Sequence, residues 1–200
     1  MVTAGPRIGV LALQGDVDAH ARALAEVGAV AVPVRLPAQL DGLDGLVIPG
    51  GESSTLLKLA ARDGMFEALK NFAETMPVFG TCAGCILLAR RVLRPEQASL
   101  GVLDATVERN GYGRQIDSAI LPTPTVLPGG AMEAVYIRAP RIVATGPAVE
   151  VLATRDGEPV LVRQGRLLAA TFHPELSADR RVHRLFRDMA AVGTEAHRAA

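Results

Sequence analysis

One cysteine stands where the sequence favours nucleophilic chemistry. Cys82 lies between Gly80 and Gly84, after a short apolar run and before a helical pattern, which predicts a sharp turn from a buried strand into a helix. Two small neighbours let strand and helix approach closely at such a turn. Free N–H groups and the dipole at a helix N-terminus favour a thiolate over a thiol, so we expect Cys82 to be nucleophilic near neutral pH.

A histidine and a carboxylate near the C-terminus have the chemistry to serve that cysteine. His173, Pro174 and Glu175 end the last predicted strand, and side chains two residues apart across a proline can emerge at one strand end. Either residue alone is more often a satisfied turn residue or a carboxylate at a helix start. Combined with the turn at Cys82, they predict a triad in which Glu175 orients His173 and His173 accepts the thiol proton.

A second pattern overlaps the first and leaves an alternative open. Cys82-Ala83-Gly84-Cys85 is a C-x-x-C sequence at a strand-to-helix junction, as in thioredoxin-like redox proteins. A redox protein would need a reversible Cys82–Cys85 couple and would not need His173. A further alternative is a flavodoxin-like domain that binds a partner without turnover.

A glycine pair marks another loop with possible chemistry. Pro49-Gly50-Gly51-Glu52 precedes a helical pattern but lacks the spacing of a Walker A or dinucleotide-binding fingerprint. Two glycines before a helix start can present backbone N–H groups to a negatively charged oxygen. Ser53 or Ser54 is expected to cap the helix that follows.

The elements expected around these loops form an α/β fold. Apolar runs that alternate with helical patterns predict a doubly wound, mostly parallel sheet flanked by helices, with antiparallel additions after Pro95. Ligands gather at the carboxyl ends of the strands in such sheets, so the glycine pair and Cys82 should face one cleft. The expected strands are 8–13, 29–35, 45–48, the run before Cys82, 105–108, 134–137, 149–153, 160–162 and 167–172; the expected helices are 18–27, one through 56–60, 65–75, one from Cys82 to about 90, and 178–191.

Composition and charge indicate the number of domains, the partners and the location to expect. The chain has 200 residues, of which 49% are hydrophobic, and its 21 basic residues balance its 21 acidic ones. We expect one domain over 1–200, with 194–200 as a frayed tail, and neither nucleic acid nor a membrane as partner. No metal site is expected. Two cysteines three residues apart form no secreted disulfide framework, and no signal peptide is evident, so the expected location is the cytoplasm.

The sequence resembles the class I, triad-type glutamine amidotransferases, and among them the glutaminase subunits of pyridoxal 5′-phosphate synthases. The resemblance covers nearly the whole chain. The strand-to-helix turn and the His-Pro-Glu segment indicate only the superfamily, whereas the Gly-Gly-Glu-Ser, Glu-Arg-Asn and Ile-Arg-Ala-Pro segments are more specific. The segments that carry it are 9–15, 49–53, 79–84, 108–110, 113–115, 137–140 and 172–176.

The resemblance implies a reaction and a site. Cys82 attacks the side-chain amide of L-glutamine, ammonia leaves, and water resolves a glutamyl thioester to glutamate. His173 shuttles the proton, Glu175 orients His173, and backbone N–H groups near Gly51 and of Ala83 stabilise the oxyanion. The residues that it implies for glutamine binding are Gly50, Gly51, Glu52, Arg109, Ile137 and Arg138.

The resemblance also implies a partner. A synthase subunit receives the ammonia through a protected path, so pyridoxal phosphate is a product of the complex and no cofactor is expected in this chain. A glutaminase that feeds histidine or nucleotide biosynthesis remains the alternative within the superfamily.

Four residues depart from the family pattern, of which Gly111 and Tyr112 replace an expected serine and phenylalanine, a mild change. Cys85 replaces an aliphatic residue and is expected to be a small apolar residue on the buried helix face, with an oxidative Cys82–Cys85 disulfide as the alternative. Ala19 stands before His20 where a glutamate is expected, which leaves that first turn without an assigned role. His20 itself is expected at the surface of its helix or as a capping residue.

Overall fold

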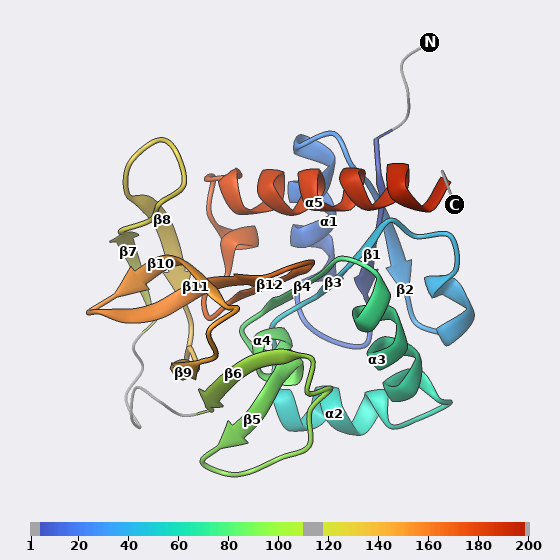
Figure 1. Ribbon diagram of the computed structural model, residues 1–200, viewed down its shortest axis with the longest axis horizontal. Helices are drawn as coiled ribbons and strands as arrows, with labels where there is room; N and C mark the ends of the chain where they lie inside the picture. Colours follow the sequence, from blue (N-terminus) through green and yellow to red (C-terminus); the bar gives the residue numbers. More distant parts are fainter. Residues whose placement is uncertain (1–4, 110–117, 199–200) are drawn as a thin grey trace.

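The fold is built on a central sheet of seven strands (Figure 1). The computed structural model describes residues 5–109 and 118–198, with side chains to residue 192. The sheet order is β10-β11-β12-β4-β3-β1-β2, and the five strands from β12 to β2 run parallel. The strands are β1 (Arg7–Leu11), β2 (Val30–Val34), β3 (Gly45–Ile48), β4 (Val78–Thr81), β10 (Glu150–Arg155), β11 (Glu158–Gln164) and β12 (Leu167–Ala170).

Helices cover both faces of this sheet (Figure 1). The helices α1 (Val17–Glu26) and α5 (Arg181–Arg198) lie on one face, and α2 (Ser53–Ala60), α3 (Met65–Thr75) and α4 (Ala83–Leu88) lie on the other. The doubly wound, mostly parallel α/β fold is therefore confirmed, and its antiparallel additions are β10 and β11 at one edge.

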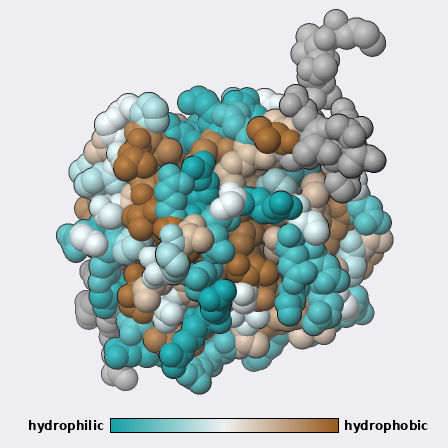
Figure 2. All heavy atoms as spheres, in the orientation of Figure 1, coloured by the Kyte–Doolittle hydropathy of each residue, from teal (hydrophilic) through white to brown (hydrophobic). Residues whose placement is uncertain are grey.

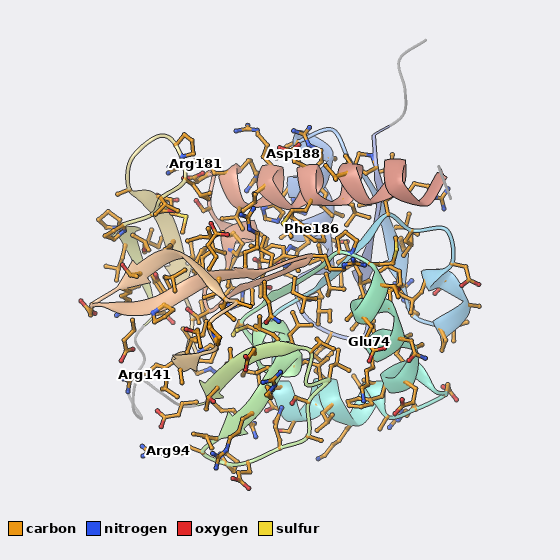
Figure 3. The ribbon with its side chains drawn as sticks, in the orientation of Figure 1. Glu74, Arg94, Arg141, Arg181, Phe186 and Asp188 are labelled. Atoms are coloured by element: carbon orange, nitrogen blue, oxygen red, sulfur yellow. The ribbon has the colours of Figure 1, made fainter. Side chains whose placement is uncertain are left out.

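Each face of the sheet has its own apolar core because successive side chains of a strand point to opposite faces. In β4, Val78 packs under α3 and α4, whereas Phe79 packs under α1 and α5. The Phe79 ring lies 5.5 Å from that of Phe186, which points from α5 toward the sheet (Figure 3). Both faces of the parallel strands are thus buried, as their nearly continuous apolar sequences require.

The second half of the chain adds two smaller sheets. Three strands, β5 (Ala89–Leu93), β6 (Leu103–Glu108) and β9 (Arg141–Thr145), form one, and the hairpin of β7 (Ala119–Thr123) and β8 (Met132–Tyr136) forms the other. The sequence predicted β6 and β8 but not β5, β7 or β9. Two short 3₁₀ helices occur at Pro37–Leu40 and Pro174–Leu176.

The predicted boundaries differ from the observed ones in places that depend on pairing. The helix after Cys82 ends at Leu88 rather than near residue 90, because Ala89 adopts an extended backbone and begins β5, which pairs with β6. Helix α5 continues to Arg198, into the segment expected as a frayed tail, where alanine, arginine and glutamate favour helix. Strand 45–48 and helix 65–75 are confirmed at both ends.

Two predicted hairpins are confirmed, and one predicted loop lies outside the description. The turn at 155–158 joins β10 to β11, with positive φ at Asp156 and Gly157 as a type I′ turn requires. The turn at 164–166 joins β11 to β12. The polar loop predicted over 110–115 lies outside the described residues.

Two surface features complete the fold. On the face seen in Figure 2, apolar residues lie in patches among polar ones. A groove of about 680 Å³ opens beside α5 and is lined in part by Pro77 and Arg166, which precede β4 and β12. It therefore lies at the amino ends of the strands, at the opposite end of the sheet from Cys82.

None of the helices that the structure describes is both long enough and apolar enough to cross a membrane.

Candidate active site

The predicted strand-to-helix turn is present at Cys82, and its backbone is strained. Cys82 follows β4 and caps α4 with φ 47° and ψ −102°, a conformation that residues other than glycine rarely adopt. The two flanking glycines are required by close approach: a Cβ at Gly80 would lie 2.5 Å from the carbonyl carbon of Gly84, and one at Gly84 would lie 2.1 Å from the carbonyl oxygen of Ile48. The strand and the helix can meet at this angle only with glycine at both positions.

The structure brings His173 and Glu175 to this turn. β12 pairs with β4, so the residues after the two strands are neighbours. His173 forms a side-chain hydrogen bond with Cys82, and its Nδ1 lies 2.8 Å from Oε1 of Glu175, which is buried in the 3₁₀ turn after Pro174. The backbone N–H of His173 donates to the carbonyl of Val135, 2.8 Å away, and anchors the segment.

The environment of His173 and Glu175 favours an ion pair. Burial alone would lower the pKa of His173, but its hydrogen bonds with Cys82 and Glu175 outweigh burial and raise this pKa well above its usual value. Burial would raise the pKa of Glu175, but the hydrogen bond from His173 and the positive charge of nearby histidine lower it. The carboxylate thus stays ionised and can hold a protonated imidazole beside the Cys82 sulfur.

A small cavity opens in front of Cys82. Its volume is about 160 Å³, well below the size of sites for drug-sized ligands, and suits a molecule the size of an amino acid. Seven of the predicted catalytic and binding residues are among those that line it. The lining residues are Gly51, Glu52, Ser53, Cys82, Ile86, Arg109, Ile137, Arg138 and His173.

Gly50 lies behind the cavity and packs directly against the reactive side chains. A Cβ at this position would lie 2.4 Å from Cε1 of His173 and 3.2 Å from Cβ of Cys82. Glycine is therefore required here because the His173 ring occupies the space that any side chain would take.

The carboxylate of Glu52 caps helix α2, which corrects the expectation that Ser53 or Ser54 would do so. Its Oε1 accepts from the Ser54 N–H at 3.1 Å, and its Oε2 accepts from the Thr55 N–H at 2.7 Å. The longer carboxylate side chain also reaches both hydroxyl groups, at 2.7 and 2.8 Å. Hydrogen bonds from Ser54 and Thr55 together lower the pKa of Glu52 to about 2.

Two arginines bring positive charge to the cavity. Nη2 of Arg109 donates to Oε1 of Glu52 at 3.2 Å and to Oγ of Ser54 at 2.9 Å, so the helix cap also positions this guanidinium. Arg138 lines the cavity from an exposed loop and has φ 43°, a second strained backbone beside the site. An anionic group of a ligand would meet complementary charge here.

The two predicted oxyanion donors belong to different segments, Gly51 to the glycine loop at the cavity and Ala83 to the start of α4. Gly51 has φ 130°, and a Cβ there would lie 3.0 Å from Nε2 of Gln14. That amide donates to the carbonyl of Glu52 at 2.7 Å and holds the glycine loop in place. Ala83 begins α4, where the first N–H groups have no partner within the helix. The roles of Gly51 and Ala83 remain predictions.

Sequence reasoning missed a buried cluster behind Glu175. His20 is fully buried, so its expected place at the surface or in a cap was wrong. Its ring lies within 3.4 Å of Thr81, Glu175 and His183, and none of these three contacts was predicted. The signal was present in the periodicity of α1, because His20 falls on the face that also buries Ala23 and Leu24.

The second cysteine behaves as a core residue. Cys85 is fully buried within the apolar cluster under α4, as expected, and burial raises its pKa to about 12. Both cysteines are free thiols. A thiol with so high a pKa is a poor partner for rapid disulfide exchange, which weakens the redox alternative. Among the residues with described structure, no cluster of histidine, cysteine, aspartate and glutamate could hold a metal ion.

Comparison with known proteins identifies related chains over nearly the full length. The model of the SNO glutamine amidotransferase family matches residues 10–191. A pyridoxal 5′-phosphate synthase subunit PdxT from Koribacter versatilis is 63% identical over 94% of this chain and 97% of its own. A protein of the same name from Acidothermus cellulolyticus is 54% identical over 94% of this chain and 95% of its own.

Solved structures agree with these matches. A crystal structure described as a glutamine amidotransferase is 47% identical, with a TM-score of 0.85 over 92% of this chain and 98% of that one. A putative GMP synthase subunit from Thermoplasma acidophilum, at 19% identity and a TM-score of 0.73, shares the fold. On the family match and the identity to its relatives, the chain belongs to the SNO glutamine amidotransferase family.

Proposed function

We propose that this protein is the glutaminase subunit of a pyridoxal 5′-phosphate synthase and that it hydrolyses L-glutamine to L-glutamate and ammonia. The observation that carries the proposal is the position of His173, hydrogen-bonded to Cys82 on one side and to Glu175 on the other, at the wall of a cavity sized for an amino acid. The names of its relatives at 54% and 63% identity supply the complex in which this chemistry is used.

In the proposed reaction, the Cys82 thiolate attacks the side-chain carbonyl carbon of glutamine and forms a tetrahedral intermediate. The N–H groups of Gly51 and Ala83 hold its oxyanion, and such donors typically contribute about 3 kcal/mol each. His173 gives its proton to the leaving nitrogen, and ammonia departs from a glutamyl thioester. A water molecule then loses a proton to His173 and attacks the thioester, which releases glutamate and restores the thiolate–imidazolium pair.

The charged residues of the cavity bind the two charged groups of glutamine. The α-carboxylate of glutamine pairs with the guanidinium groups of Arg109 and Arg138, and its α-ammonium group pairs with the carboxylate of Glu52. Ile137 packs against the aliphatic part of the substrate. Gly50 leaves room for the His173 ring rather than contacting the substrate, since a Cβ there would lie 2.4 Å from that ring.

The ammonia passes to a synthase subunit, which uses it to make pyridoxal phosphate. That compound is a product of the complex, and the glutaminase reaction itself needs no cofactor. The complex is placed in the cytoplasm as part of the same proposal, on the basis of cysteine usage.

The test is the release of glutamate and ammonia from glutamine by the purified chain, with and without the cognate synthase subunit. Hydrolysis that depends on Cys82, rises with the synthase subunit and survives Cys85→Ala supports the proposal. Folded protein that releases no ammonia in either condition contradicts it. A Cys82–Cys85 couple titrated by a thiol–disulfide buffer, with no effect of His173→Ala, would favour a redox protein instead.

A further inference from the structure

A buried cluster of polar side chains lies behind the candidate active site and contacts both Glu175 and Thr81, the residue before Cys82. His20 extends from α1, which lies beside α5 over one face of the sheet (Figure 1). Its Nε2 lies 3.3 Å from Oγ1 of Thr81, the residue directly before Cys82, and 3.4 Å from Oε2 of Glu175. Its Nδ1 lies 3.2 Å from Nε2 of His183 on α5. Three elements that meet only in the folded protein thus converge on one imidazole.

The two oxygens of Glu175 have different partners. Oε1 receives the hydrogen bond from His173 at 2.8 Å. Oε2 is buried and has no hydrogen-bond partner among the described residues, while Nε2 of His20 lies 3.4 Å from it. A buried carboxylate oxygen without a donor is costly, and a hydrogen on Nε2 of His20 at 3.4 Å offsets part of that cost through its positive partial charge.

The hydrogen-bond geometry fixes where the protons lie on the two histidines. A carboxylate only accepts and a hydroxyl can also accept, so a hydrogen on Nε2 of His20 suits both of its neighbours, Oε2 of Glu175 and Oγ1 of Thr81. In a neutral ring Nδ1 is then bare, and Nε2–H of His183 must donate to it. That leaves Nδ1 of His183 bare, and this atom is the one that is buried without a partner. The opposite arrangement would bury an unpaired N–H and set a nitrogen lone pair against the carboxylate.

We infer that His20, held in this tautomer by His183, is a positioning residue that fixes the second oxygen of Glu175 and the end of β4 at Thr81. Glu175 is then aimed at His173, and the backbone that carries Cys82 is fixed by the same imidazole. This inference rests on the proposed function and adds to it a residue that touches neither the substrate nor the reacting atoms.

The surroundings of the pair keep both rings neutral, as this role requires. Burial lowers the pKa of His20, and Glu175 and Asp16 oppose this effect while His173 adds to it. Burial is the largest effect on His183 and lowers its pKa to about 3, while the charge of Glu175 opposes this effect and that of Arg180 adds to it. A neutral His20 donates to Glu175 without taking away the negative charge that His173 needs.

The kinetic test compares His20→Leu with His20→Gln in glutamine hydrolysis by the complex with the synthase subunit. Leucine removes the donor to Glu175, and we expect kcat to fall roughly 10- to 100-fold with KM little changed, the effect of one hydrogen bond to a charged group. Glutamine restores an N–H near the position of Nε2 and should recover most of kcat. The control is Leu24→Ala, which opens a cavity on the same buried helix face without touching the cluster and should lower Tm but leave kcat unchanged.

A spectroscopic test does not depend on activity. Two-bond ¹H–¹⁵N correlation spectra of the wild-type protein should show His20 and His183 at pH 7 as neutral rings protonated at Nε2, and His183→Leu should shift the His20 signals. An imidazolium, or a ring protonated at Nδ1, for either residue overturns the inference. An active wild type whose kcat is unaffected by His20→Leu also overturns it, whereas a wild type that releases no ammonia overturns the proposed function itself.

Discussion

Replacement of Gly50 by alanine tests whether the position of the His173 ring limits the reaction. A Cβ at Gly50 would lie 2.4 Å from Cε1 of His173, so the ring must move by about 1 Å to reach an ordinary contact distance. Misplacing a reacting group by about 1 Å can reduce the rate about 100-fold. This corresponds to a loss of about 2.7 kcal/mol of transition-state stabilisation. Gly50 does not have positive φ, so alanine adds no backbone strain there.

Stability and activity should therefore separate in this variant. The atom that must move is the far end of a side chain, so we expect the Tm of Gly50→Ala to stay close to that of the wild type. The matched control is Gly101→Ala, where φ is 73° and nothing lies within 4 Å of the new Cβ. That change strains the backbone by about 1 kcal/mol and should lower Tm without changing hydrolysis.

The assay is the rate of ammonia release from glutamine in the presence of the synthase subunit, measured as kcat/KM for both variants. Alkylation of Cys82 by iodoacetamide at several pH values reports separately on whether the displaced imidazole still activates the thiol. A kcat/KM for Gly50→Ala within threefold of the wild-type value would refute the idea that Gly50 serves to admit the His173 ring.

Four further changes probe the cap, the cavity, the second cysteine and the core. Since hydrogen bonds lower the pKa of Glu52 from 4.5 to about 2, its contribution to stability is present above about pH 4.5 and is lost as the pH falls toward 2; the loss between pH 5 and 3 in urea unfolding should be smaller in Glu52→Gln. Arg109→Ala should raise KM for glutamine more than it lowers kcat, since Arg109 lines the cavity and in the proposed mechanism binds the α-carboxylate without taking part in the bond changes; a fall in kcat with KM unchanged would contradict this. Cys85→Ala should keep kcat within about twofold because the thiol is buried and unpaired; loss of hydrolysis would revive a role for the C-x-x-C pair. Phe186→Ala should lower the free energy of unfolding by about 3–5 kcal/mol, since this ring is fully buried between α5 and the sheet (Figure 3); a loss below 1 kcal/mol would show that α5 is not part of the core.

The parts of the site that the sequence predicted depend on local chemistry. The turn at Cys82 was readable because two glycines, an apolar run and a helix start all fall within a few residues. The parallel sheet was readable because runs such as 45–48 are apolar on both faces. His173 and Glu175 followed from their place at the end of a predicted strand, although β12 pairs with β4 across about 90 residues of chain.

The parts that the sequence did not predict are set by distant contacts. His20 resembles a surface histidine when its helix is considered alone, and its burial depends on Thr81, Glu175 and His183, which come from other elements. Strands β5 and β9 form because β6 lies between them, and their sequences have no strong alternation of their own. Glu52 displaced the serines as the helix cap because its longer side chain reaches both N–H groups, a geometry that residue type alone does not predict.

The place of β12 in the sheet affects how this protein can be made. β12 is the last strand of the chain, yet it lies between β11 and β4, and it carries His173 to the side of Cys82. Until Leu167–Ala170 leave the ribosome, β4 has an open edge on a strand that the finished fold buries completely. Nascent and truncated chains that lack this segment therefore hold Cys82 without His173, and under the proposed mechanism they should release no ammonia. The same incomplete chains expose an apolar strand edge, which is a site for aggregation during synthesis.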